Sequence, residues 1–188
     1  LIGNELSNTL EGMAGDDILE GKGGDDVLEG GDGNDTFIAT SHNDGKDTID
    51  GGTGSDTIDY SKLGASHAIN ITLAEADIYA TVTVTGGDND IVKNIENVIG
   101  TAGADTIVGN SSNNTLIGGA GNDIIKGVAG NNKLYGGDGN DTIYSGTGDD
   151  IINGGSGSGE ENTVHYGEAT SGVTVDLSNS LAQTVGGG

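Results

Sequence analysis

The chain has 188 residues, of which 38 are glycine, and it contains no proline, cysteine or tryptophan. Thirty acidic and six basic residues give a formal net charge of −24, and only 32% of the residues are hydrophobic. This composition excludes a conventional globular core of this length, a disulfide framework, and a basic surface for nucleic acid or anionic membranes.

A nine-residue unit recurs through most of the chain with the pattern Gly-Gly-x-Gly-x-Asp-x-aliphatic-x. It runs from Gly3 to residue 59, interrupted by three extra residues at 39–41, and it returns without a break over residues 100–153. Glycines at the first, second and fourth positions permit positive φ angles and close backbone approach. Positions seven to nine predict a short strand with one inward aliphatic side chain. Two such units per coil would stack loops eighteen residues apart, roughly 4.8 Å from one another.

The sixth position of the unit carries the candidate metal ligands. A carboxylate that follows a glycine turn can join backbone carbonyls around a hard cation, and calcium takes about six to eight oxygen ligands. The same nonapeptide is typical of calcium-binding parallel β-helices. We assign to the metal sites nine aspartates, Asp17, Asp26, Asp35, Asp47, Asp56, Asp105, Asp123, Asp141 and Asp150. We add nine turn glycines, Gly12, Gly15, Gly24, Gly30, Gly33, Gly54, Gly103, Gly121 and Gly139.

The first block, residues 1–59, opens with a degenerate unit in which Asn8 replaces the aspartate. Stacking of the loops predicts three pairs of aspartates in this block: Asp17 with Asp35, Asp26 with Asp47, and Asp35 with Asp56. The insertion at residues 39–41 lengthens the last two separations to 21 residues.

Residues 60–99 break the nine-residue period. Apolar residues alternate with polar ones over residues 69–73 and again over 82–84, which predicts two strands. The residues Gly86-Gly87-Asp88-Asn89 predict a turn. We interpret this segment as wider coils of the same solenoid that link the two blocks. An independent inserted domain is the alternative, although forty residues are few for one.

The two edges of the second block, residues 100–159, differ in their sixth-position residues. One edge carries Asp105, Asp123 and Asp141, and the other carries Asn114, Asn132 and Asp150. Because a neutral amide is a weaker calcium ligand than a carboxylate, we expect two ions on the first edge and none between Asn114 and Asn132, whose amides could stack instead.

Beyond the second block the period fades. Glu160 and Glu161 stand where the next aspartate is expected, and residues 160–188 are interpreted as the start of a further linking segment. Residues 164–177 echo residues 58–73, which indicates a longer repeat of roughly 105 residues and a longer parent protein.

The chain resembles the RTX (repeats-in-toxin) family of secreted bacterial proteins, on eight or so near-complete repeats. The run from Ile91 to Gly100 is similar to the strand that feeds the β-roll of serralysin-type proteases. The resemblance implies an all-β, right-handed parallel β-roll with calcium between stacked glycine-rich turns. It also implies export by a type I secretion system, and hence a place outside the cell or on a bacterial cell surface.

The sequence carries no motif for catalytic chemistry. His42, His67 and His165 lie far apart without metal-ligand spacing, and the chain has no H-E-x-x-H, G-x-S-x-G or P-loop. No stretch approaches the roughly 20 apolar residues of a membrane span, and the N-terminus has no basic region of a cleaved signal peptide. We therefore expect no catalytic residues, no organic cofactor and no transmembrane segment.

The function predicted from the sequence is that of a structural or adhesin module that folds on binding five or more calcium ions. Metal binding would supply the folding free energy that so small a core lacks. The alternative is a non-catalytic accessory and secretion module of an RTX metalloprotease, lipase, alginate epimerase or toxin. The expected partners are calcium, flanking domains of a longer chain and, through the parent protein, a carbohydrate or cell-surface ligand.

Overall fold

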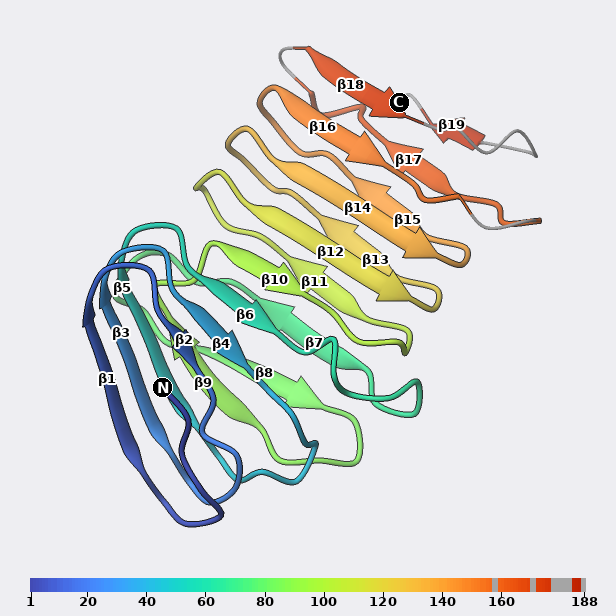
Figure 1. Cartoon of the computed structure of the whole chain (residues 1–188). Coiled ribbons are helices and arrows are strands. Elements are labelled where there is room, and N and C mark those ends of the chain that lie inside the picture. Colours follow the sequence, from blue (N-terminus) through green and yellow to red (C-terminus); the bar gives the residue numbers. More distant parts are fainter. Residues whose placement is uncertain (157–158, 170–171, 177–183, 187–188) are drawn as a thin grey trace.

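The computed structural model describes residues 1–156, 159–169, 172–176 and 184–186. Every regular element in these ranges is a β-strand, and none of the described residues forms a helix that could cross a membrane. The coils stack in a long pile, with the first described strand and the last described strand at opposite ends (Figure 1).

The described strands form two facing sheets, one with eleven strands and one with eight, whose spatial orders are β1-β3-β5-β9-β8-β7-β11-β13-β15-β17-β19 and β18-β16-β14-β12-β10-β6-β4-β2. The larger sheet contains β1 (Thr9–Ala14), β3 (Val27–Asp32), β5 (Thr48–Thr53), β7 (Ile69–Thr72), β8 (Ala80–Val84), β9 (Asp90–Lys93), β11 (Thr106–Val108), β13 (Ile124–Lys126), β15 (Thr142–Tyr144), β17 (Thr163–His165) and β19 (Thr184–Gly186). The smaller sheet contains β2 (Ile18–Leu19), β4 (Thr36–Ile38), β6 (Thr57–Asp59), β10 (Asn97–Ile99), β12 (Thr115–Ala120), β14 (Lys133–Asp138), β16 (Asp150–Asn153) and β18 (Val173–Asp176).

The register of the strands confirms the predicted coil of two repeats. Within the second block, neighbours in a sheet are parallel and eighteen residues apart, as in the pair of Ile107 with Ile125. Across the insertion at residues 39–41 the separation becomes 21 residues, as in the pair of Leu28 with Ile49. The chain therefore forms the predicted all-β parallel solenoid.

Within the nine-residue units, the core takes one inward side chain from each strand. Because successive side chains of a strand point to opposite faces, the eighth position of the repeat faces inward and positions seven and nine face outward. These inward residues are at most 4% exposed, and they are Leu19, Leu28, Phe37, Ile49, Ile58, Val98, Ile107, Leu116, Ile125, Leu134, Ile143 and Ile152. The core is thus continuous along the coil axis but only two side chains thick.

The segment of residues 60–99 belongs to this core but differs from the predicted wider coils. Strand β8 is antiparallel to both β7 and β9, so it reverses the chain inside the larger sheet. The loops of residues 73–79 and 85–89 are too short to return to the same end of the sheet, and only an antiparallel pair can be joined in this way. Strand β9 then pairs in parallel with β5, and β7 pairs in parallel with β11. The two predicted strands are present, and the coil interpretation is wrong for β8.

The register also corrects the assignment of Glu160 and Glu161. Strand β17 pairs with β15 at a separation of 21 residues, as in the pair of Thr142 with Thr163. Asn162, and neither glutamate, therefore takes the sixth position of that coil. Parts of the predicted linking segment, residues 170–171, 177–183 and 187–188, lie outside the described residues.

Truncation of one core side chain should test this packing. Ile125 is 0% exposed, whereas its neighbour Ile124 is 41% exposed on the outer face of the same strand. We expect Ile125→Ala to lower the free energy of unfolding in calcium by about 2–5 kcal/mol, and Ile124→Ala by about 0.5 kcal/mol or less. Urea unfolding followed by circular dichroism measures both, and equal effects would contradict the inward assignment of position eight.

Candidate metal sites

The sixth-position side chains stack in columns along the two edges of the coil pile, and one hydrogen bond recurs in every column. In each pair, the backbone N–H of one sixth-position residue donates to a side-chain oxygen of the residue one coil further on. The donor–acceptor distances are 2.8 Å for Asp17 to Asp35 Oδ1, 2.9 Å for Asp26 to Asp47 Oδ1 and 2.8 Å for Asp35 to Asp56 Oδ1. The three pairs predicted for the first block therefore lie together.

The second block repeats this arrangement on both of its edges. Asp105 N–H donates to Asp123 Oδ1 at 2.8 Å, and Asp123 N–H donates to Asp141 Oδ1 at 2.9 Å. On the other edge, Asn132 N–H donates to Asp150 Oδ1 at 2.8 Å. Each bond fixes one oxygen of the accepting side chain and so determines where the other oxygen points.

The second carboxylate oxygen is buried without a donor in most of these residues. Among the described residues, the buried Oδ2 atoms that accept no hydrogen bond are those of Asp26, Asp35, Asp56, Asp123, Asp141 and Asp150. A buried polar atom without a partner is costly, and a buried unpaired carboxylate is costlier still. An oxygen-seeking cation would remove this cost.

Several of these unpaired Oδ2 atoms have a backbone carbonyl oxygen of the next coil close by. A Cβ added to Gly30 would overlap both Asp35 Oδ2 and the carbonyl oxygen of Gly51 in the next coil. Gly118 stands in the same relation to Asp123 Oδ2 and the Gly136 carbonyl. The first-position glycine therefore leaves room for two converging oxygens, a carboxylate and a carbonyl, which are the ligands that calcium prefers.

The assigned glycines divide into two structural classes. Most of those at the fourth position have φ between +97° and +140°, where a side chain is strained; they are Gly15, Gly24, Gly33, Gly54, Gly121 and Gly139. The remaining three, Gly12, Gly30 and Gly103, have no such φ angle. A Cβ at Gly12 or Gly30 would instead overlap the aspartate of the same repeat.

The candidate sites depend on backbone oxygens as much as on side chains. No group of three or more His, Cys, Asp or Glu side chains gathers around a common point in the described part of the chain. A cation between two coils would therefore be held by one or two carboxylates and several turn carbonyls, which fits the broad coordination of calcium.

Burial changes the acidity of these carboxylates. It raises the pKa of Asp47 and of Asp123 from the ordinary 3.8 to about 7. It also raises the pKa of Asp56 and of Asp141 to about 6, and backbone hydrogen bonds oppose the shift in all four. Near neutral pH, these groups therefore favour a proton or a cation over a bare negative charge.

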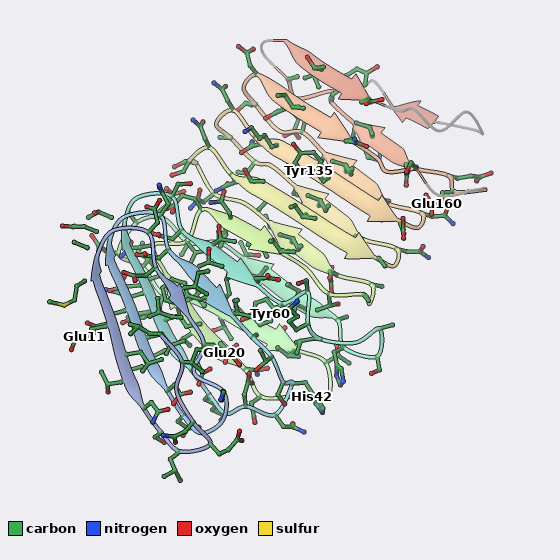
Figure 2. The ribbon with its side chains drawn as sticks, in the orientation of Figure 1. Glu11, Glu20, His42, Tyr60, Tyr135 and Glu160 are labelled. Carbon is green, nitrogen blue, oxygen red and sulfur yellow. The ribbon has the colours of Figure 1, made fainter. Side chains whose placement is uncertain are left out.

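In two aspartates, the assigned Asp105 and the unassigned Asp90, both carboxylate oxygens accept hydrogen bonds from the chain itself. Asp105 Oδ2 accepts hydrogen bonds from the backbone N–H of Thr101 at 2.6 Å and from its hydroxyl at 3.2 Å. Asp90 Oδ1 accepts from Asp47 N–H at 3.1 Å, and Asp90 Oδ2 accepts from the hydroxyl of Tyr60 at 2.9 Å. Tyr60 is 1% exposed and lies inside the molecule (Figure 2).

Sequence reasoning missed three members of the columns, Asp90, Glu96 and Asn162. Asp56 N–H donates to Glu96 Oε2 at 2.9 Å, and Asp141 N–H donates to Asn162 Oδ1 at 2.8 Å. A usable signal existed for the two acids, because Asp90-Ile91-Val92 and Glu96-Asn97-Val98 both keep the acid and the aliphatic residue two positions apart, as in the repeat. The repeat is hard to recognise there because the glycine that stands two residues before the aspartate in most other units is absent before Asp90 and Glu96.

Two of the histidines that lie far apart in the sequence meet in the folded structure. The rings of His42 and His67 stack with their centroids 3.9 Å apart, and those of Tyr144 and His165 stack at 4.5 Å. His67 Nδ1 lies 3.0 Å from the carbonyl oxygen of Thr85, which follows β8. The stacked rings of His42 and His67 therefore join the first block to the segment of residues 60–99.

Comparison with known proteins gives one family match and structural neighbours. The model of the RTX calcium-binding nonapeptide repeat matches four times, at residues 2–37, 43–60, 99–134 and 126–160. No curated protein sequence matches the chain. The extracellular lipase LipA from Serratia marcescens is a solved structure similar at 16% identity with a TM-score of 0.22, over 86% of this chain and 31% of the lipase. The chain thus spans about a third of the length of that neighbour.

The family matches fall on the stretches that build both stacks of coils, and the segment of residues 61–98 lies between them. Their sixth-position carboxylates and turn carbonyls converge between stacked coils, as a calcium-binding repeat requires. Because the matches cover more than half of its residues, the chain belongs to the RTX calcium-binding nonapeptide repeat family.

Proposed function

We propose that this RTX segment is a calcium-dependent folding module of a longer protein that acts outside the cell or on a bacterial cell surface. The observation that carries the proposal is the set of buried Oδ2 atoms without a donor between the stacked turns. An RTX repeat region is structural and non-catalytic, so its direct activity would be the cooperative binding of calcium coupled to folding.

The ligand chemistry favours calcium over other divalent ions. The converging atoms, such as Asp35 Oδ2 and the Gly51 carbonyl, are all oxygens, whereas zinc and copper favour imidazole or thiolate. Magnesium requires a nearly ideal octahedron of ligands and retains several of its waters, so a site made of carboxylates and carbonyls from two stacked turns suits it poorly. We assign the nine predicted aspartates and the facing turn carbonyls as the ligands of five or more ions.

The charge of the chain supports a switch between two environments. A net charge of −24 opposes compaction in a low-calcium cytoplasm. Binding to the folded state alone shifts the equilibrium toward that state as the calcium concentration rises. The module would then be exported as an extended chain and fold outside, where it serves an adhesin-like parent as a stiff spacer or an enzyme as an accessory segment.

The edge with two asparagines supports a metal-free position in the second block. Asn132 Nδ2 donates to the carbonyl oxygens of Ala129 at 3.1 Å and Gly130 at 3.3 Å, and Asn114 Nδ2 donates to the carbonyl of Glu96 at 2.9 Å. The amides thus bond to backbone carbonyls and satisfy turn oxygens that a cation would otherwise bind. We propose that no calcium binds between Asn114 and Asn132.

Calcium titration of the chain tests the main proposal. From calcium-free buffer to ~10 mM calcium, we expect the far-ultraviolet circular dichroism to change steeply from disordered to β-sheet, with no such change in magnesium. Asp123→Asn should raise the calcium concentration at the midpoint about tenfold, equivalent to about 1.4 kcal/mol.

Asp138→Asn provides the matched control, because Asp138 is exposed and carries the same charge in the same block. It should leave the midpoint within about twofold, since exposed charges contribute little. A fully folded spectrum without calcium, or equal shifts in the two variants, would contradict the proposal.

The raised pKa values predict opposite pH dependences with and without calcium. For Asp47 and Asp123, the pKa lies near 7 in the metal-free fold against an ordinary 3.8, so the fold binds more protons than the unfolded chain. The metal-free fold should therefore gain stability as the pH falls from 8 to 5 and lose it as the pH rises through about 7. In calcium the order should reverse, because protons compete with the ion. The folded fraction by circular dichroism at pH 5 and pH 8, with and without calcium, measures this, and the same trend in both conditions would exclude proton–calcium competition.

A gain of one ion should follow the substitution Asn132→Asp. The new carboxylate would remove the amide donor and face Asp150, whose Oδ2 has no donor among the described residues. We expect equilibrium dialysis to find one more bound calcium per chain than in the wild type. The control Asn131→Asp adds the same charge at an exposed position and should leave the number unchanged, and an unchanged number in Asn132→Asp as well would refute the metal-free assignment.

A further inference from the structure

The first block and the second block meet at a position that no nonapeptide repeat builds. Strand β10 pairs in parallel with β6, so that Asn97 lies beside Thr57 although forty residues separate them. This register brings Glu96 to the sixth position one coil beyond Asp56. The family matches end at residue 60 and resume at residue 99, so Glu96 lies outside the matched repeats.

The oxygens at this junction reproduce those between true repeats. Asp56 is 0% exposed, and its Oδ2 accepts no hydrogen bond from the described residues. A Cβ at Gly51 would overlap both Asp56 Oδ2 and the carbonyl oxygen of Asn94, just as one at Gly30 would overlap Asp35 Oδ2 and the Gly51 carbonyl. In the next coil, Asn94 therefore takes the place of the first-position glycine and supplies the carbonyl oxygen.

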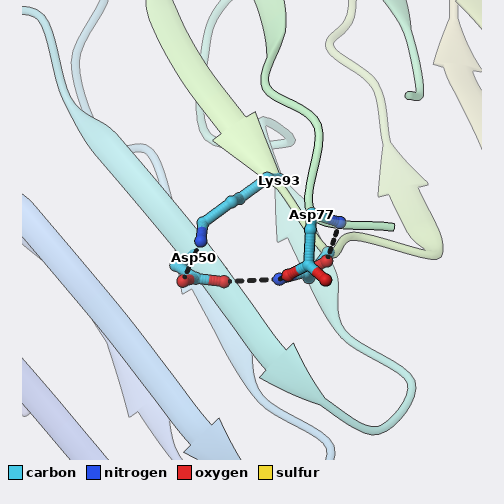
Figure 3. A network of polar contacts seen from close by, with 4 residues as sticks. Asp50, Asp77 and Lys93 are labelled. Carbon is cyan, nitrogen blue, oxygen red and sulfur yellow. Dashed lines mark hydrogen bonds and ion pairs between the residues drawn. The ribbon is translucent and has the colours of Figure 1, made fainter. Parts of the chain in front are cut away.

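The side chain of Asn94 fixes the direction of that carbonyl. Asn94 has φ of +54°, a left-handed conformation that asparagine tolerates better than most residues. Its Nδ2 donates to Asp50 Oδ1 at 2.8 Å, and its Oδ1 accepts from the backbone N–H of Asp77 at 2.7 Å. Lys93 Nζ lies 2.8 Å from the other oxygen of Asp50, which completes the network in Figure 3. Asn94 is thus anchored to β5 and to the loop before β8.

The other edge of the same junction shows how a column closes without an ion. There Asp90 stands beyond Asp47, but its Oδ2 accepts the hydroxyl proton of Tyr60. No comparable donor reaches Asp56 Oδ2 among the described residues. On the Glu96 edge, only Oε2 accepts the backbone N–H of Asp56, which leaves Oε1 as a second carboxylate oxygen for a ligand.

We propose that Asp56, the carbonyl of Asn94 and Glu96 form a calcium site that joins the two blocks across the inserted hairpin. The proposal rests on the calcium-dependent function proposed above and adds a site that lies outside the repeats. The ion links two segments that are forty residues apart in the sequence, and because it binds only the folded junction, it stabilises that junction as the calcium concentration rises. With calcium bound here, β7, β8 and β9 become part of one cooperative unit rather than a flexible link between two stacks.

The test uses the full chain in calcium and counts bound ions by equilibrium dialysis. Glu96→Gln keeps an acceptor for Asp56 N–H but removes the charge, and it should bind one calcium fewer than the wild type. Glu96→Asp keeps the charge and matches the aspartate of true repeats, so it should retain the ion. Glu29→Gln, at an exposed position of β3, should bind the wild-type number.

Hydrogen exchange supplies a readout that does not depend on the ion count. In calcium, Glu96→Gln should lose protection at residues 94–99 and in the hairpin of residues 69–93, whereas residues 115–144 of the second block should retain it. Wild-type ion number and protection in Glu96→Gln would overturn the junction site. If the wild-type chain itself bound no calcium, the function proposed above would fail as well, so the two failures are distinguishable.

Discussion

The structure depends on a single repeated hydrogen bond, from the backbone N–H of one sixth-position residue to a side-chain oxygen one coil further on. It links neighbouring coils at both edges and fixes the orientation of each carboxylate. The same bond directs the second oxygen into the turn, where glycine leaves room and a carbonyl of the next coil faces it. Where no other donor reaches that second oxygen, stacking of the coils leaves it unpaired, and a positive ion or a proton is required there.

The thin core explains why that requirement cannot be met by packing alone. Each coil buries two aliphatic side chains, such as Leu116 and Ile125, which contribute roughly 1.5–3 kcal/mol each. A buried carboxylate costs several kcal/mol when it is unpaired, and three carboxylates of the first block, those of Asp26, Asp35 and Asp56, have a buried oxygen without a donor among the described residues. The two terms are of similar size, so the metal-free coil gains little from its core while its edges remain charged. The asparagine edge of the second block lowers this cost, because Asn114 and Asn132 are neutral and find their own partners.

The regular parts of this fold could be predicted because each nine-residue unit determines its own turn, strand and inward side chain. Periodicity also predicted which coils stack, including the shift of register caused by residues 39–41. The reversal of β8 could not be predicted in the same way, since it depends on loop lengths in competition with the parallel ladder on either side. The stacking of His42 on His67 was equally hidden, because it joins two loops that the period does not relate.

The candidate site shows the same limit at the level of single atoms. The nonapeptide identifies which aspartates stand in the columns, but it does not reveal that Thr101 satisfies Asp105 or that Tyr60 satisfies Asp90. Those partners come from a degenerate second position and from the residue that follows β6, thirty residues away in the sequence. An aspartate in the consensus position is thus a more complete candidate ligand where its second oxygen lacks a donor. By that criterion Asp56 at the block junction is as complete a candidate as Asp35 or Asp123 within the repeats, although the turn after β9 rather than a repeat supplies its partners.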